Sequence, residues 1–453
     1  MTSRPIATAR GALSAPTGRP AAAAYGALSA LSLINLLNYA DRYLLAGALP
    51  LVQREFGGTD AQMGVLSASF LVVFSAVSPL TGLLGDRVAR TWLVGGGALL
   101  WSAATAWGGC AESYTELLIA RALVGVGEAG YGAAAPSLLA DLFPPAWRGR
   151  ALAIFFAAVP LGAGLGYGAG GALGSAFGWR AAFLLAAAPG CLLGALALLL
   201  REPRRGAFDR PDAPRERLDA AGAGLAACAP AGASVTPRAV GRALLARPSY
   251  LLNVIGATAM SFATGGLGAW MPTFLFRERG VPLATAGLAF GALLIGAGAL
   301  ATLAGGWAGD RLQRRDRGAS FSLTGLSLAL AAPFALVAVI ATRPPLYWAA
   351  IGVALFLLFF NTGPLNAALL NVAPPTMRAS AVALHTFATH AFGDALAPAL
   401  LGALGDVISL PYALAFNAGA VALAGAIFWL GRAALRADLG PVAPPPAPPQ
   451  TGR

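Results

Sequence analysis

Ionisable side chains occur inside long apolar segments at four positions in the first half of this 453-residue chain. Asp41 and Arg42 are adjacent, and Arg121 and Glu128 are seven residues apart, which is about two turns of a helix. A charge in such a segment costs about 2.5–3.5 kcal/mol when the segment enters a bilayer, so it usually marks function. We predict that Asp41 and Glu128 carry protons and that Arg42 binds an anionic substrate group.

Helical periodicity groups these charges with polar neighbours. Asn38 lies one turn before Arg42, and Tyr131 follows Glu128 at one turn. Because lipid does not solvate polar faces of this kind, they should line a cavity inside a helical bundle. We predict Asn38, Arg121 and Tyr131 as further substrate contacts. A static network of structural ion pairs is the alternative, and it applies most strongly to Arg121.

The second half holds both histidines of the chain, His385 and His390. His390 and Asp394 are four residues apart and can pair on one helix face. Asn361 adds a polar side chain on the preceding apolar segment. We predict that these four residues contact the substrate as well. The alternative for the histidines is a hydrogen bond that only joins neighbouring helices.

One sequence motif occurs twice, each time after an apolar segment. The copies read Gly82-Leu-Leu-Gly85-Asp86-Arg87-Val-Ala-Arg90 and Gly306-Trp-Ala-Gly309-Asp310-Arg311. Glycine lets helices approach closely, and an aspartate can face an arginine or a helix N-terminus. We predict a latch that must open during a conformational cycle, with the alternative that these charges only set topology. The residues assigned to the latch are Gly82, Asp86, Arg87, Arg90, Asp141, Asp310 and Arg311.

Apolar segments dominate the chain, with 57% hydrophobic and 11% charged residues. Crossing a bilayer takes about 20 apolar residues in a helix. Twelve segments meet this length: 25–49, 62–85, 92–110, 115–142, 149–172, 180–201, 248–275, 285–309, 319–341, 346–372, 378–402 and 410–433. They predict an all-α membrane protein with twelve transmembrane helices in two six-helix halves.

Changes in composition along the chain predict its organisation. Residues 202–247 are rich in Pro, Ala and Arg and interrupt the apolar pattern, and the segment after Leu439 is rich in proline. The predicted parts are an N-terminal tail (1–24), a first half (25–201), a linker (202–247), a second half (248–435) and a Pro-rich tail (436–453).

Basic charge is distributed unevenly among the loops. The formal net charge is +12 and all 31 basic residues are arginine. The arginines cluster in every second loop, whereas the alternate loops hold few. This is the positive-inside pattern, which predicts a multi-pass protein of the bacterial inner membrane with both termini in the cytoplasm. The charge therefore reports topology, and we predict no nucleic-acid partner.

Four stretches carry a resemblance to a known family. They are Asn38-Tyr-Ala-Asp41-Arg42-Tyr43, Gly125-Val-Gly127-Glu128-Ala-Gly-Tyr131, Pro160-Leu-Gly162-Ala-Gly-Leu-Gly166-Tyr167-Gly168 and His390-Ala-Phe-Gly393-Asp394. With the repeated motif, they make residues 25–435 resemble the major facilitator superfamily, and within it the spinster-like lipid transporters. The resemblance is near-continuous from Asn38 to Gly171 and looser in the second half. It implies a secondary transporter of a lysophospholipid or sphingoid phosphate. With Asp41 and Glu128 as proton carriers, we predict proton-coupled transport by alternating access.

Other classes of protein lack their motifs here. A primary pump needs a Gly-x-x-x-x-Gly-Lys-Ser/Thr loop, and this chain has no lysine. Neither Gly-x-Ser-x-Gly nor His-Glu-x-x-His occurs, so we predict no enzyme. Cys110, Cys191 and Cys228 are scattered, and we predict no metal and no cofactor. A proton symporter of a small organic anion such as a sugar acid stays open, as does a non-transporting lipid receptor. The predicted partners are the substrate, protons and the membrane, with a monomer sufficient.

Overall fold

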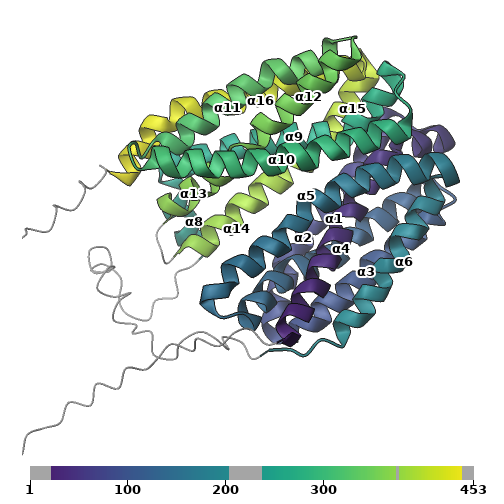
Figure 1. Ribbon diagram of the computed structural model, residues 1–453, viewed down its shortest axis with the longest axis horizontal. Helices are drawn as coiled ribbons and strands as arrows, with labels where there is room; N and C mark the ends of the chain where they lie inside the picture. The colour runs from purple at the N-terminus through teal and green to yellow at the C-terminus, as the bar shows by residue number, and fades with distance from the viewer. Residues whose placement is uncertain (1–21, 204–236, 374–376, 441–453) are drawn as a thin grey trace, which may run out of the picture.

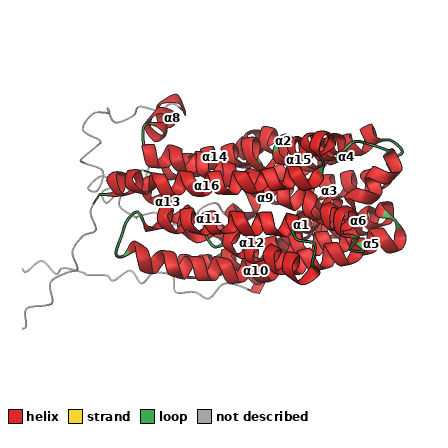
Figure 2. Cartoon of the chain, turned by 90° about the horizontal axis from the view of Figure 1, so that it is seen from above, coloured by secondary structure: helices red, strands yellow, loops and turns green. Residues whose placement is uncertain are grey.

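The computed structural model describes residues 22–203, 237–373 and 377–440, and nearly all of them are helical (Figure 2). The predicted linker and both predicted tails fall largely outside these ranges, so the division into domains stays a prediction. Where the linker is described, it contains the short helix α8 (Pro237–Leu245).

Six long helices form the first half within residues 22–203. They are α1 (Ala22–Phe56), α2 (Asp60–Arg87), α3 (Arg90–Gly109), α4 (Tyr114–Leu142), α5 (Pro145–Phe177) and α6 (Trp179–Leu198). Local sequence fixes several of their starts. The Thr59 hydroxyl accepts a hydrogen bond from the backbone N–H of Gln62, and the Gln62 side chain accepts one from the Thr59 N–H. This capping box begins α2 at Asp60.

The second half repeats the pattern with two spans that are broken into shorter helices. Its elements are α9 (Pro248–Arg279), α10 (Leu283–Gln313), α11 (Ala319–Ile340), α12 (Pro344–Phe359), α13 (Thr362–Val372), α14 (Arg378–Thr389), the π-helical turn η3 (His390–Asp394), α15 (Ala397–Ile408) and α16 (Leu410–Leu439). Helices α12 and α13 together make one span, and α14, η3 and α15 make another. π-helical turns inside α-helices occur frequently at functional sites.

Ten helices among the described residues are long and apolar enough to cross a membrane, when each broken span is taken as one helix. Helices α1 and α3 complete the predicted set of twelve. Both are long enough, with 35 and 20 residues, but α1 carries Asp41 and Arg42, and α3 is rich in glycine and tryptophan. The predicted fold class, twelve membrane-spanning helices in two six-helix halves, is confirmed.

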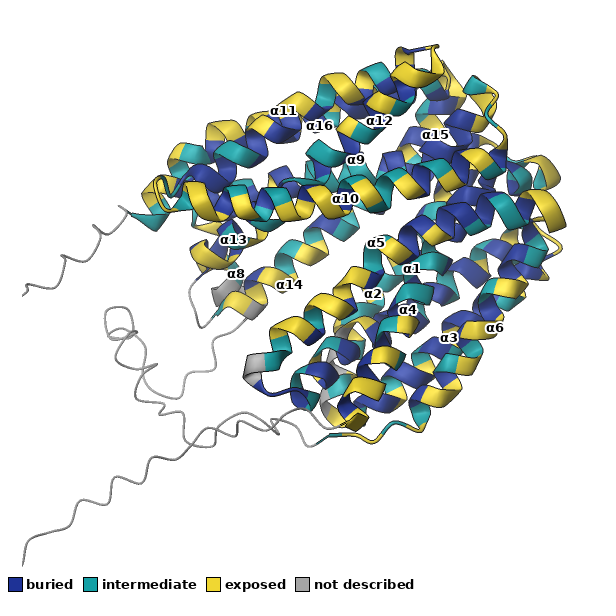
Figure 3. Cartoon of the chain, in the orientation of Figure 1, coloured by how far each residue is buried: buried dark blue, intermediate teal, exposed yellow. Residues whose placement is uncertain are grey.

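The two halves lie side by side, with α1–α6 in one and α9–α16 in the other (Figure 1). Helix α5 packs against α10, and α2 packs against α15, so these pairs form the seam between the halves. Exposed residues lie along the outward faces of the helices (Figure 3). Many of them are large and apolar, such as Leu199, Leu303 and Leu430, as lipid contact requires.

One end of the molecule, which we call the closed end, brings the halves together at residues 53–61, 277–281 and 406. Toward the opposite end, which carries α8 and which we call the open end, the helices of the two halves diverge (Figure 1). The loops 88–89, 143–144 and 314–318 lie at this open end.

Glycines let α5 and α10 approach closely at the seam. A Cβ atom at Gly291 would lie 2.3 Å from the carbonyl oxygen of Gly164, and one at Gly287 would lie 2.3 Å from that of Tyr167. Real Cβ atoms do not come this close to backbone oxygens, so any larger residue must separate the two helices. Contact at the α5–α10 seam therefore depends on glycine.

Gly291→Ala is expected to destabilise the protein by about 1–3 kcal/mol, because the added methyl group forces the two backbones apart. Thermal unfolding of the purified protein in detergent measures this. Gly296→Ala is the matched control, since its Cβ on the same helix would meet nothing within 4 Å. Equal unfolding temperatures for the two variants would contradict the role of this contact.

Candidate transport site

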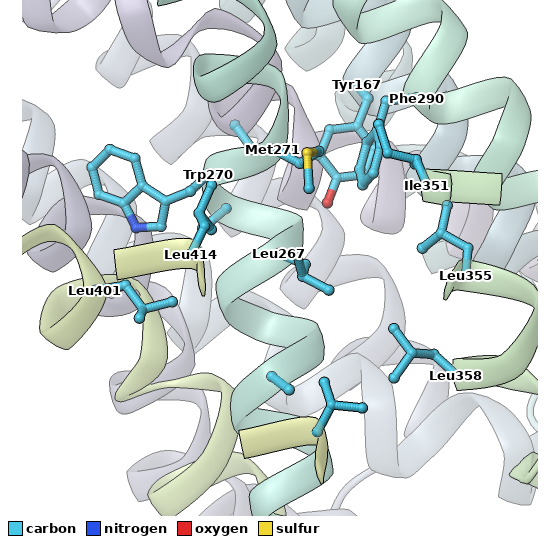
Figure 4. Packing of buried hydrophobic residues seen from close by; sticks show 14 of the residues in the cluster. Tyr167, Leu267, Trp270, Met271, Phe290, Ile351, Leu355, Leu358, Leu401 and Leu414 are labelled. Atoms are coloured by element: carbon cyan, nitrogen blue, oxygen red, sulfur yellow. The ribbon is translucent and has the colours of Figure 1, made fainter. Parts of the chain in front are cut away.

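A cavity of about 250 Å³ lies between the two halves, beside the middle of α1. Both halves line it: α1, α2, α4 and α5 from the first, and α9, α10, α12, α13, η3 and α15 from the second. Its charged lining residues are Arg42, Arg121 and Asp394. Leu267 of α9 lies near Leu355 and Leu358 of α12, on the apolar part of the lining (Figure 4).

The four predicted charges of the first half lie together, and the two arginines among them line this cavity. Arg42 Nη2 lies 2.5 Å from Glu128 Oε2, and Arg121 Nη1 lies 3.9 Å from Asp41 Oδ2. Thr105 on α3 donates a hydrogen bond of 2.7 Å to the same Asp41 oxygen. Two carboxylates thus face two guanidinium groups, with Asp41 and Glu128 buried.

Several donors of the two arginines have no hydrogen-bond partner among the described residues. They are Nε of Arg42 and both Nε and Nη1 of Arg121. Arg121 is only 1% exposed, yet it lines the cavity. These nitrogens are themselves buried, but both arginine side chains line the cavity, so their positive charge favours an anionic ligand there.

An aromatic wall on α1 and α2 surrounds the guanidinium groups. Arg42 lies 4.7 Å from the ring centroid of Tyr39, 5.0 Å from that of Phe70 and 5.6 Å from that of Phe74. Arg121 lies 5.3 Å from the Phe70 centroid. These contacts hold both cations in place. Sequence reasoning missed this wall, although Phe70 and Phe74, four residues apart and so on one helix face, were a signal.

Asn38 and Tyr131 do not line the cavity in this conformation. The Tyr131 hydroxyl donates to the carbonyl of Leu31 at 2.9 Å, and its ring packs edge-to-face on Trp101. Asn38 is buried, and its Nδ2 has no partner among the described residues. The geometry gives Tyr131 a role in joining α4 to α1, and a substrate contact for either residue stays a prediction.

Of the predicted residues in the second half, only Asp394 lines the cavity. His390 Nδ1 lies 2.9 Å from Asp394 Oδ2, which is the pairing that the spacing predicts. His385 lies away from the lining, and its Nε2 has no partner within the described chain. Asn361 is buried and donates to the carbonyl of Leu358 at 2.8 Å, at the break between α12 and α13.

Part of the predicted latch is assembled at the open end. Arg90 Nη1 lies 2.6 Å from Asp141 Oδ2, and Arg90 Nε lies 2.7 Å from Glu202 Oε1. Glu202 also accepts a hydrogen bond from the backbone N–H of Thr91, so it caps α3. Sequence reasoning did not include Glu202, although it is the first acidic residue after the sixth span.

Among the described side chains of the other latch residues, no further ion pair of this kind is formed. The surroundings of Gly82 and the side chain of Asp86 lie outside the described part of the structure, and Arg87 is exposed. In the second copy of the motif, Asp310 is exposed and Arg311 lies 5.9 Å from the Trp307 ring centroid. A latch at either copy stays a prediction.

A second, smaller pocket opens beside the cavity within the second half. Leu267, Phe290 and Leu355 line both of them, so the two spaces adjoin. Its lining is entirely apolar, and it comprises Leu267, Met271, Phe290, Ala335, Ala338, Ile351, Ala354 and Leu355. Small alanine side chains form three of these positions. The site is therefore charged toward the first half and apolar toward the second.

An ion cluster joins the halves at the closed end. Arg277 donates to both carboxylate oxygens of Asp60, at 2.7 and 3.1 Å. Asp406 of α15 accepts from the backbone N–H groups of Asp60 and Ala61, both at 2.8 Å, so the second half caps a helix of the first. Sequence reasoning missed this cluster, although arginines are scarce in the loops on this side.

Tyr167 lies between the charged site and the closed end, where it contacts both halves. Its hydroxyl donates to the carbonyl of Gly268 across the seam at 2.8 Å. Its ring packs on Tyr43 and edge-to-face on Phe290 (Figure 4). Fully buried and between both halves, Tyr167 forms part of the cavity lining.

Twelve membrane spans in two six-helix halves, with a charged cavity between them, define a membrane transport protein. The chain belongs to the major facilitator superfamily, whose family model matches residues 31–393, and within it to the spinster-like proteins. It is a transporter by family and not an enzyme.

Individual relatives support this assignment. The chain is 35% identical over 399 residues to Protein spinster homolog 1 of Bos taurus, covering 83% of this chain and 72% of the relative. It is 34% identical over 427 residues to Sphingosine-1-phosphate transporter SPNS2 of Mus musculus, covering 88% and 75%. A bacterial homolog to the human lysosomal transporter Spinster, in an inward-facing and unoccupied conformation, has the same fold, with a TM-score of 0.82, 22% identity, and 93% and 99% of the two chains covered. The resemblance that the motifs predict is confirmed.

Proposed function

We propose that this protein is a proton-coupled secondary transporter of an amphipathic lipid that carries a phosphate, of the lysophospholipid or sphingoid-phosphate kind. One observation carries the proposal: the side chains of Arg42 and Arg121 and an apolar wall of the second half line the same cavity. An anionic headgroup suits the arginines, and an alkyl chain suits the apolar wall. The relative SPNS2, named as a sphingosine-1-phosphate transporter, supports this substrate class.

The coupling to protons follows from competition for Arg42. A substrate phosphate that binds Arg42 competes with Glu128, which now lies 2.5 Å from that guanidinium. A buried carboxylate that loses its counter-charge takes up a proton more readily. Substrate and proton binding are then linked, and each biases the conformational equilibrium. In this proposal Asp41, near Arg121, is the second proton carrier.

We further propose that the open end faces the cytoplasm of a cell whose inner membrane holds the protein. The arginine clusters at 87–90, 148–150 and 311–317 belong to that end, in keeping with the positive-inside pattern. Alternating access then requires the closed end to separate while the open end closes. Because one chain encloses the whole cavity, a monomer suffices for transport.

Flux of a labelled lysophospholipid into proteoliposomes, with and without an inward proton gradient, tests the proposal. We expect gradient-dependent uptake. Arg42→Ala should abolish it, because that change removes the guanidinium that binds the phosphate of the lipid headgroup. Arg343→Ala, at an exposed position outside the cavity and the predicted latch, is the control that should retain uptake. Absence of flux under any gradient, in protein that elutes as a folded species, would refute lipid transport.

A proton symporter of a small organic anion is the second candidate. The cavity volume of about 250 Å³ favours it, since it lies just below the usual range of about 300–1,000 Å³ for ligand pockets. Thermal unfolding with lysophospholipid or with a sugar acid separates the two, because only the true ligand raises the unfolding temperature.

The small apolar pocket has a volume of about 10 Å³, so we propose that the end of an alkyl chain enters only by widening it, and that the pocket thereby limits the chain length. Ala338→Leu fills this pocket and is expected to shorten the longest chain that is transported. Each methylene excluded from an apolar site costs about 0.8 kcal/mol, or about fourfold in affinity. Binding of a series of lysophospholipids that differ only in chain length measures this.

Ala329→Leu is the control for that series, because Ala329 lies on the same helix but is exposed. An unchanged chain-length profile in Ala338→Leu would contradict a tail site in this pocket.

A further inference from the structure

Charges of opposite sign face each other across the cavity. The first half contributes Arg42 and Arg121, and the second half contributes Asp394, whose side chain is 22% exposed. Within the first half each arginine already has a carboxylate beside it, whereas Asp394 belongs to the other half. The proposed phosphate site accounts for the arginines but does not say which substrate group the predicted contact Asp394 would bind.

Aromatic side chains of α2 bring the two charged walls close together. The ring of Phe74 packs edge-to-face on His390, with centroids 6.2 Å apart, and the same ring lies 5.6 Å from the Arg42 guanidinium. Ala395, next to Asp394, packs against Phe70, whose ring also contacts both arginines. One ligand headgroup can therefore reach both walls.

The position of Asp394 is fixed by the backbone around it. Asp394 is the last residue of the π-helical turn η3. A Cβ atom added at Gly265 of α9 would lie 2.7 Å from the Cβ of Asp394, so α9 packs closely against it. The only hydrogen bond it accepts from a described residue is from His390 Nδ1. A carboxylate has about four acceptor sites, so Asp394 retains capacity for another donor from the cavity.

We propose that Asp394 binds an ammonium group and that the transporter prefers zwitterionic headgroups, with a phosphate at the arginine wall and an amine at the Asp394 wall. This inference rests on the proposed lipid transport. An ammonium group donates charge-assisted hydrogen bonds to a carboxylate. A headgroup with a net negative charge places its excess charge near Asp394 and is disfavoured.

Two lysophospholipids with the same acyl chain test the preference. Lysophosphatidylethanolamine carries an ammonium group, and lysophosphatidylglycerol carries hydroxyl groups in its place. Competition of each against a labelled lysophospholipid on the purified full chain gives their relative affinities. We expect the ethanolamine lipid to bind about tenfold more tightly, which corresponds to about 1.4 kcal/mol. Asp394→Asn should bring this ratio close to one, by weakening the ethanolamine lipid and strengthening the glycerol lipid.

His390→Gln is the matched control, because it removes the partner of Asp394 but leaves the carboxylate, and it should keep the preference. If Asp394 only positions His390, Asp394→Asn will weaken both lipids equally and leave the ratio unchanged, which overturns the inference. Equal binding of both lipids to the unaltered protein also overturns it while sparing the proposed lipid transport. Failure of both lipids to bind would refute lipid transport and this inference with it.

Discussion

Glu128→Gln is expected to abolish proton-driven uptake in proteoliposomes while leaving substrate binding in place. Glu128 is 1% exposed, and its Oε1 accepts no hydrogen bond from a described residue. Glutamine keeps the shape of the side chain and can still accept from Arg42, but it carries no charge and takes up no proton. Uptake measured with and without a proton gradient should therefore become equal.

Controls separate proton coupling from folding. Breaking a buried ion pair costs about 3–5 kcal/mol, so elution and unfolding of the variant must be measured beside its flux. The double variant Arg42→Gln with Glu128→Gln removes both charges and should restore stability without restoring coupling. Glu112→Gln, at an exposed carboxylate before α4, should behave as the unaltered protein. Gradient dependence retained in both Glu128→Gln and Asp41→Asn would refute the proposed role of these carboxylates.

The charged half of the site was predictable from sequence because charges in apolar segments are costly. Such residues must face protein and not lipid, and helical spacing then shows which of them share a face. This reasoning placed the four charges of the first half at one cavity and paired His390 with Asp394. In the structure Arg42 lies 2.5 Å from Glu128, and His390 lies 2.9 Å from Asp394. The twelve spans were predictable for the same physical reason, since only apolar helices of sufficient length can cross a bilayer.

Apolar lining residues could not be predicted in this way. Phenylalanine and leucine occur on every face of these helices, so periodicity does not separate a cavity wall from a lipid contact. Phe70 and Leu355 line the cavity, whereas Leu303 is 74% exposed, and nothing in their local sequence distinguishes them. Tyr131 shares a helix with Glu128, but the small rotation between their positions directs its hydroxyl to the Leu31 carbonyl.

Contacts between the two halves could not be predicted from the sequence either, because they depend on how the two helical bundles pack against each other. Asp60, Arg277 and Asp406 are far apart in the chain and lie in three different loops or helix ends. Each alone resembles an ordinary charge at a helix terminus. Their meeting depends on the present conformation, in which this end is closed, and this makes them informative about the transport cycle.

Arg277→Gln is expected to open the closed end. The Asp60 side chain is 5% exposed and receives two hydrogen bonds from Arg277, whose side chain is 33% exposed. Without the guanidinium, Gln53 is the one described residue whose side chain still donates a hydrogen bond to the buried Asp60 carboxylate. That loss raises the free energy of the closed arrangement and not that of the separated one, so the population shifts toward opening. Because the pair is charge-assisted but partly exposed, removing one partner should raise the ratio of open to closed molecules by about tenfold.

A cysteine in the cavity measures this opening directly. Ser67→Cys places a thiol in the cavity lining, in a background where Cys110, Cys191 and Cys228 are replaced by serine. A membrane-impermeant maleimide added from the closed side should label it about tenfold faster in Arg277→Gln and in Asp60→Asn.

Arg343→Gln provides the comparison, because Arg343 is exposed in a loop of the same half at the same end. It should leave the labelling rate unchanged, since no ion pair across the seam involves it among the described residues. Faster labelling in all three variants would show that loss of any charge at this end loosens the protein. Unchanged labelling in Arg277→Gln and Asp60→Asn would mean that the backbone caps from Asp406 and the Tyr167 contact hold this end by themselves. The ion pair would then have no part in gating, and the cycle would have to begin at the seam between α5 and α10.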